Sequence, residues 1–170
     1  MTKYIYNKKY AFDDGYIYLP LDIRNLPEQI TVEGYSLQLK TELHCSLVCI
    51  KCMELKYGKN FDNLESKIVE RFCEFVSKNE ISFIKYRNEF RLVKRAGRVS
   101  VVVMCDVSNL EDFFHLLEKK FGIKADTQPT HVTSYTLQPN KGIGIPDQAT
   151  LQLTTLVNVP DEVRKSFNLL

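Results

Sequence analysis

The fold of this chain is decided by two short stretches, HCSLV at residues 44–48 and HVTSY at residues 131–135. In each stretch a histidine stands two residues before a hydroxyl residue, inside a run of residues typical of a β-strand. Side chains at positions i and i+2 of a strand point to the same face. The spacing therefore predicts that an imidazole and a hydroxyl lie side by side twice, as His44 with Ser46 and as His131 with Thr133.

Two imidazoles that face one cleft suit phosphodiester chemistry. With an ordinary pKa of about 6.5, one ring can be neutral while the other is protonated near neutral pH. The neutral ring can take a proton from an attacking hydroxyl, and the protonated ring can give one to the departing oxygen. Ser46 and Thr133 would each donate a hydrogen bond to a phosphate oxygen and stabilise the charge that grows there. This scheme uses no metal and no cofactor, and neither stretch contains a carboxylate.

The two stretches resemble the paired His-x-Ser/Thr motifs of the two-histidine (2H) phosphoesterases, also called LigT-like proteins. One motif lies in each half of the 170 residues, as in that family. Two positions depart from the usual pattern: Ser46 stands where threonine is common, and Ser134 stands where an apolar residue is common.

The resemblance implies a single domain over residues 1–170 with a bilobal α+β fold. In that fold two antiparallel β-sheets flank a central cleft, and helices pack outside. The resemblance also implies that His44, Ser46, His131 and Thr133 are catalytic, and that the reaction is the opening of a 2′,3′-cyclic phosphate. The reverse reaction would be 2′-5′ RNA ligation. Degradation of cyclic-oligonucleotide signals and trimming of RNA 3′ ends are alternatives within the family.

Three further residues are candidates for substrate binding. Tyr135 follows Thr133 by two positions, so the strand pattern predicts that it shares the motif face, although packing in the core is an equal alternative. Arg91 and Arg95 belong to a strip at residues 85–98 with six basic residues interleaved with Tyr86 and Phe90. Such a strip can hold an RNA backbone while its aromatic rings stack on bases, or it can be a solvated hairpin. A loop at the cleft mouth is expected at residues 142–146.

Two other classes of protein compete with an enzyme of this kind. The first is a binding module that holds nucleotides without turnover. The second is a cysteine-bound metal or cluster protein, because Cys45, Cys49 and Cys52 have C-x3-C-x2-C spacing. A strand-like run would send Cys52 to the face opposite Cys45 and Cys49, whereas a cluster requires a loop that curls around it. We therefore expect all five cysteines to be free thiols and the protein to be cytoplasmic.

The composition is that of an ordinary globular domain. The chain has 44% hydrophobic and 26% charged residues and a net charge of +2, which is too small to argue for nucleic acid by itself. No apolar run approaches the roughly 20 residues that cross a bilayer. Residues 1–10 are polar and basic, so no secretory signal is expected. We expect a monomer whose partners are RNA ends or nucleotide substrates, with no membrane association.

Hydrophobic periodicity predicts the main elements around the two motifs. Helices are expected at residues 61–79 and 110–121, each with one apolar stripe, and Gly122 should end the second. Strands are expected at residues 16–23, 37–53, 81–93, 98–107, 130–137 and 149–157, with a turn at Ala96 and Gly97.

Overall fold

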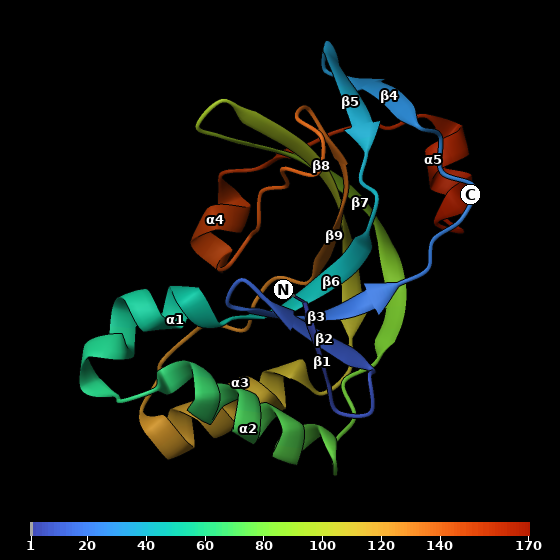
Figure 1. Cartoon of the computed structure of the whole chain (residues 1–170). Coiled ribbons are helices and arrows are strands. Elements are labelled where there is room, and N and C mark those ends of the chain that lie inside the picture. The colour runs from blue at the N-terminus through green and yellow to red at the C-terminus, as the bar shows by residue number, and fades with distance from the viewer. Residues whose placement is uncertain (1) are drawn as a thin grey trace.

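The structure is a computed structural model that describes residues 2–170, and it is an α+β fold built on one antiparallel sheet (Figure 1). The described residues form the strands β1 (Lys3–Ile5), β2 (Tyr10–Asp13), β3 (Tyr16–Leu21), β4 (Gln29–Val32), β5 (Tyr35–Leu39), β6 (Leu43–Cys49), β7 (Phe83–Arg95), β8 (Arg98–Val107), β9 (His131–Thr136) and β10 (Thr155–Leu156). They form the helices α1 (Ile50–Tyr57), α2 (Leu64–Val76), α3 (Leu110–Phe121), α4 (Gln148–Gln152) and α5 (Asp161–Ser166), and the 3-10 turn η1 (Gly58–Asn60).

The sheet brings the two motif strands together at its centre. Its strands follow the order β1-β2-β3-β6-β9-β8-β7-β10, and β5 of the β4–β5 hairpin adds to the far end of β9. Strands β6 and β9 meet in an antiparallel pair with Cys45 opposite Val132. Residues far apart in the sequence are therefore neighbours across one strand boundary.

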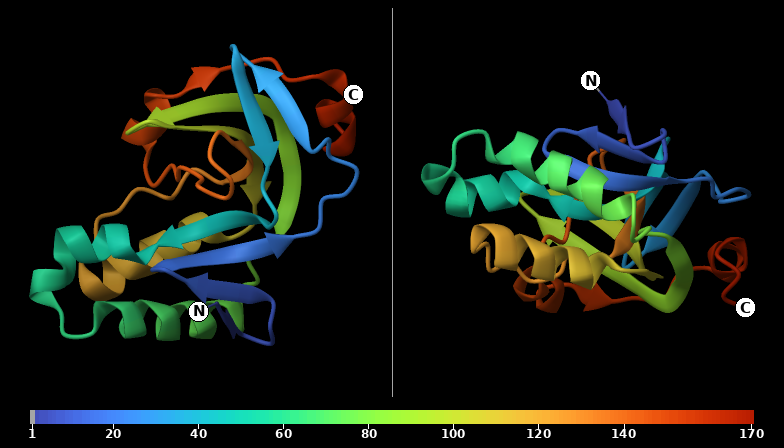
Figure 2. Two further views of the ribbon diagram at one scale, coloured as in Figure 1. Left: turned by 45° about the horizontal axis from the view of Figure 1, so that its top comes forward. Right: turned by 90° about the horizontal axis from the view of Figure 1, so that it is seen from below.

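One face of the sheet is covered by α2 and α3. Each helix turns an apolar stripe inward, with Ile68 and Phe72 of α2 and Phe113 and Leu117 of α3 almost fully buried. Phe72 and Phe113 meet edge to face with their ring centroids 5.3 Å apart, and the two helices lie side by side below the sheet (Figure 2, right). Both predicted helices are confirmed, and Gly122 ends α3 with a positive φ of 66°.

The opposite face of the sheet carries a second, smaller apolar cluster. Val102 and Met104 of β8 pack there with Val93 of β7 and with Ile143 and Ile145 from the segment that joins β9 to α4. This segment curls inside the curve of the β7–β8 hairpin (Figure 2, left). The predicted turn at Ala96 and Gly97 closes that hairpin, with positive φ at both residues.

Two of the predicted strands are wrong in part. The run at residues 149–157 begins as helix, because the Asp147 side chain accepts a hydrogen bond from the Thr150 backbone N–H and starts α4; only β10 is strand. The run at residues 37–53 is divided into β5 and β6, and its last residues begin α1. Apolar periodicity does not register a side-chain cap of this kind.

The prediction that all five cysteines are free thiols is also wrong. Cys49 and Cys52 form a disulfide, whereas Cys45, Cys73 and Cys105 are thiols. The strand ends at Cys49 and a helical turn follows, which turns Cys52 back toward Cys49 with a Cα–Cα distance of 5.3 Å. The thiol of Cys45 instead lies 3.5 Å from that of Cys105 inside the core. Among the helices of residues 2–170, none is long and apolar enough to cross a membrane.

Candidate functional site

The four motif residues form one patch on the face of the sheet away from α2 and α3. Cys45 and Val132 are fully buried in the main core, so their chain neighbours turn the other way. Because Cys45 is opposite Val132 in an antiparallel pair, the flanking positions are His44 opposite Thr133 and Ser46 opposite His131. Side chains opposite each other in such a pair have Cβ atoms about 5 Å apart. Each histidine therefore lies beside the hydroxyl of the other motif.

His131 is held in one tautomer by the backbone. Its Nδ1 lies 2.7 Å from the Pro129 carbonyl oxygen, which can only accept, so Nδ1 carries the hydrogen. In the neutral ring the remaining nitrogen, Nε2, keeps a free lone pair. The side chain is only 2% exposed. Burial lowers the pKa of His131 and the Lys40 cation lowers it further, while the bond to Pro129 opposes both effects.

His44 is oriented by an aromatic neighbour on β3. The ring of Tyr18 lies against it with a centroid distance of 4.4 Å and an interplanar angle of 35°. Burial, followed by the charges of Lys40 and His131, lowers the pKa of His44 to about 4. Both histidines are thus neutral at neutral pH when nothing is bound. The sequence-based expectation of one neutral and one protonated ring near neutral pH does not describe this state.

Lys40 supplies the positive charge of the site, and the sequence analysis missed it. It follows β5, where its backbone N–H donates to the Ser134 carbonyl oxygen at 2.9 Å. Burial lowers the pKa of Lys40, and the carboxylate of Glu42 partly opposes this. Its charge lowers the pKa of both His44 and His131, so it lies within electrostatic reach of each ring. No pattern in the sequence distinguishes Lys40 from the other lysines, because its place depends on β5 pairing with β9.

The segment at residues 137–147 lies over the patch, where the sequence predicts a loop at the cleft mouth. A Cβ atom at Gly142 would lie 3.2 Å from Thr133 Cγ2 and 3.8 Å from Lys40 Nζ. The Asn140 side-chain oxygen accepts from the backbone N–H and the hydroxyl of Thr41 at 3.0 and 3.1 Å. Beside His44, on the β3 side, a groove of about 560 Å³ opens between Tyr18, Pro20 and Thr41.

Tyr135 does not belong to this site. Val101 pairs with Tyr135 and Val102 with Thr133, so Ser134 is an extra residue in β9 and forms a bulge. The bulge reverses the alternation of faces, and Tyr135 is fully buried in the main core, where its hydroxyl donates to the Pro27 carbonyl oxygen. The strict alternation assumed from the sequence fails at this one residue.

The two predicted arginines lie apart from each other. Arg91 of β7 is opposite Val102 of β8, and Val102 is opposite Thr133 of β9. Arg91 therefore lies on the same face as Thr133, two strand spacings or about 10 Å away. Its guanidinium is engaged by Glu89 and by the Thr154 hydroxyl. Arg95 is exposed at the tip of the β7–β8 hairpin.

No family model, curated protein or solved structure matches this chain. Within residues 2–170 no three His, Cys, Asp or Glu side chains come together as a metal-binding group. The site is therefore described by its own geometry: two neutral imidazoles, two hydroxyls and one ammonium group on one face. Such a set can bind an oxyanion and move protons to and from it.

Proposed function

We propose that this chain is a metal-independent phosphodiesterase of the two-histidine type, which acts on RNA ends or small nucleotides and opens 2′,3′-cyclic phosphates. The observation that carries the proposal is the pairing of each histidine with the hydroxyl of the other motif across β6 and β9. A phosphate centred on this patch would meet both rings and both hydroxyls once the His131 ring, which is 2% exposed, is uncovered. Two unrelated strand histidines would not be expected each to lie opposite the hydroxyl residue of the other motif.

Under this proposal, each part of the reaction has a group on the patch that can perform it. Water attacks the phosphorus atom and loses a proton to one neutral imidazole, while the protonated partner ring gives its proton to the departing ribose oxygen. Ser46 and Thr133 donate to the non-bridging oxygens, and the Lys40 charge stabilises them. The bound phosphate anion raises the pKa of both rings and so restores the protonated partner that the free site lacks. The bond between Nδ1 and Pro129 keeps His131 Nε2 as the reacting atom.

The bilobal arrangement of the family belongs to this proposal. The main path of the sheet has four strands on each side of the β6–β9 boundary, with the β4–β5 hairpin added at β9, and a single registered residue pair joins β6 and β9. Under the proposal, β1-β2-β3-β6 and β9-β8-β7-β10 are the two lobes. The substrate phosphate lies where they meet.

A binding module without turnover is the second candidate, and the burial of His131 favours it. With 2% of its surface exposed, His131 meets a substrate only after a change that uncovers its ring. A protein that keeps His131 buried would hold a phosphate at His44 and Lys40 without cleaving it.

A substrate screen separates the two candidates. The purified protein is incubated with nucleoside 2′,3′-cyclic phosphates, cyclic dinucleotides and RNAs with cyclic or free 3′ ends, in excess chelator. We expect ring-opened monoester from the cyclic phosphates, and the same yield from His115→Ala, which changes the third, exposed histidine on α3. Binding without product would favour the binding module. A strict need for added metal would contradict the proposed chemistry.

A further inference from the structure

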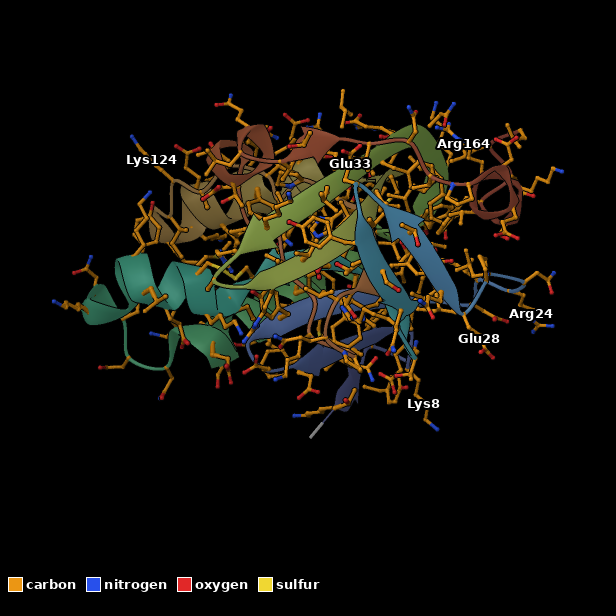
Figure 3. All side chains as sticks on the ribbon, turned by 90° about the horizontal axis from the view of Figure 1, so that it is seen from above. Lys8, Arg24, Glu28, Glu33, Lys124 and Arg164 are labelled. Atoms are coloured by element: carbon orange, nitrogen blue, oxygen red, sulfur yellow. A yellow bond between two sulfur atoms is a disulfide. The ribbon has the colours of Figure 1, made fainter. Side chains whose placement is uncertain are left out.

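A cavity of about 190 Å³ lies at the ends of the two motif strands and is separate from the groove beside His44. It is lined by α1, by Phe114 of α3 with the segment between α3 and β9, and by Pro146 and Asp147 before α4. Tyr57 and Phe114 provide aromatic walls, and Lys56 and Lys124 contribute cations. Lys124 projects at the end of the molecule where α1 lies (Figure 3).

The side chain of Gln128, which lines this cavity, carries a buried amide group without a hydrogen-bond partner among residues 2–170. The residue is 2% exposed, and neither its amide nitrogen nor its amide oxygen has a hydrogen-bond partner among residues 2–170. A buried amide without partners destabilises a fold, so its presence calls for an explanation. Gln128 also borders a cavity of about 330 Å³ on its other side, but no aromatic residue lines that one.

Chain segments that line the cavity lead directly to the proposed reaction centre. Cys49 follows Ser46 by three residues and Gln128 precedes His131 by three, so each lies at most about 10 Å of chain from the patch. Pro146 and Asp147 continue the segment whose Gly142 touches Thr133. Under this inference, a ligand with its phosphate on the patch extends around the ends of β6 and β9 into the cavity.

We propose that this cavity binds the nucleobase of the substrate, and that Gln128 reads its edge. A primary amide presents one donor and one acceptor side by side, which matches N7 and the N6 amino group of adenine. Tyr57 and Phe114 provide ring surfaces on which a base stacks. The inference rests on the proposed function and adds to it a substrate class, adenine nucleotides with a terminal cyclic phosphate.

The test compares base-containing and base-free substrates. For adenosine 2′,3′-cyclic phosphate, Gln128→Leu should lower kcat/KM about 10- to 100-fold, the usual value of a bidentate base contact. For ribose 2′,3′-cyclic phosphate, which has no base, kcat/KM should not change. Gln152→Leu, which alters an exposed glutamine on α4, is the matched control and should leave both values unchanged. Because Leu removes an unpaired buried amide, the Gln128→Leu protein should be at least as stable as the parent to heat without ligand.

Calorimetry with adenosine, which carries no phosphate, separates failure of this inference from failure of the proposed function. Adenosine should bind the parent chain and should bind Gln128→Leu about 10- to 100-fold more weakly. Binding of adenosine with no turnover of any cyclic phosphate would overturn the proposed function and leave the base site standing. Equal turnover of base-containing and base-free substrates, or equal losses on both in Gln128→Leu, would overturn the base site.

Discussion

At the scale of single residues, the lowered pKa values of the two histidines should set the pH dependence of the proposed reaction. The active form needs one protonated and one neutral ring, and both rings titrate below 6.5 in the free protein, His44 at about 4. Because both pKa values are lowered, the pair loses its remaining proton before neutral pH, so kcat/KM, which reports the free enzyme, should be highest on the acid side of neutrality. A rate profile against pH checks this, and its limbs belong to the pair rather than to either ring. A maximum above pH 7 would contradict the lowered pKa values of His44 and His131.

Lys40 should affect both kcat/KM and the pKa values of His44 and His131. Replacing it with methionine removes a cation that depresses both histidines, so the pKa of His44 should rise and the optimum of kcat/KM should move to higher pH. The loss of a charge that stabilises the phosphate oxygens should lower kcat/KM by about 10²-fold. NMR titration of the imidazoles measures the first effect. The control is Lys141→Met, which changes an exposed lysine in the segment at residues 137–147. Equal kcat/KM and equal histidine pKa values in the two variants would show that Lys40 has no role in the site.

At the scale of elements, the segment at residues 137–147 leaves no room for a side chain at Gly142 without a change in the position of Thr133. An added Cβ would press on Thr133 Cγ2 at 3.2 Å, a separation tighter than ordinary contact. Gly142→Ala should therefore displace the Thr133 hydroxyl and lower kcat by about 10-fold or more, with little change in thermal stability. The control is Gly58→Ala at the end of α1. There the added Cβ would lie 3.6 Å from Glu54 Cβ, an ordinary contact, so kcat should not change. If Gly142→Ala keeps the parent rate, Thr133 is not a phosphate donor in this position.

The β7–β8 hairpin is the element on which RNA binding should depend. Arg95 is exposed at its tip, whereas Arg91 is already engaged by Glu89 and Thr154. Arg95→Ala should weaken RNA binding and reduce the slope of log K against log salt by about 1, with no effect on a cyclic mononucleotide. Binding at several salt concentrations measures this, with the exposed Arg24→Ala as control. An unchanged slope would show that Arg95 does not contact the RNA phosphates.

Local sequence patterns predicted the elements that carry the site better than they predicted its neighbours. The spacing within residues 44–48 and 131–135 identified both strands and the side chains that share a face, because alternation in a strand is a local property. The bulge at Ser134 and the arrival of Lys40 depend on the pairing of β9 with β8 and β5. Such pairings are set by tertiary structure, so the sequence left the motif face and the core as equal alternatives for Tyr135, which lies in the core, and Lys40 was missed.

At the scale of the whole molecule, two halves of the chain form one reaction centre under the proposed function. Changing His44 or His131 to alanine should each lower kcat by about 10²–10⁴-fold, the usual cost of a lost general acid or base. Both variants should keep the circular dichroism of the parent, which separates lost chemistry from lost fold.

The most direct test is the double-mutant cycle on a 2′,3′-cyclic phosphate, with kcat measured for the parent, His44→Ala, His131→Ala and the double variant. Groups that act as a unit are strongly non-additive, so the double change should cost little more than the larger single change. If the cost of the double change equals the product of the two single costs, the histidines act independently. A His131→Ala variant at the parent rate would likewise contradict a site shared by the two motifs.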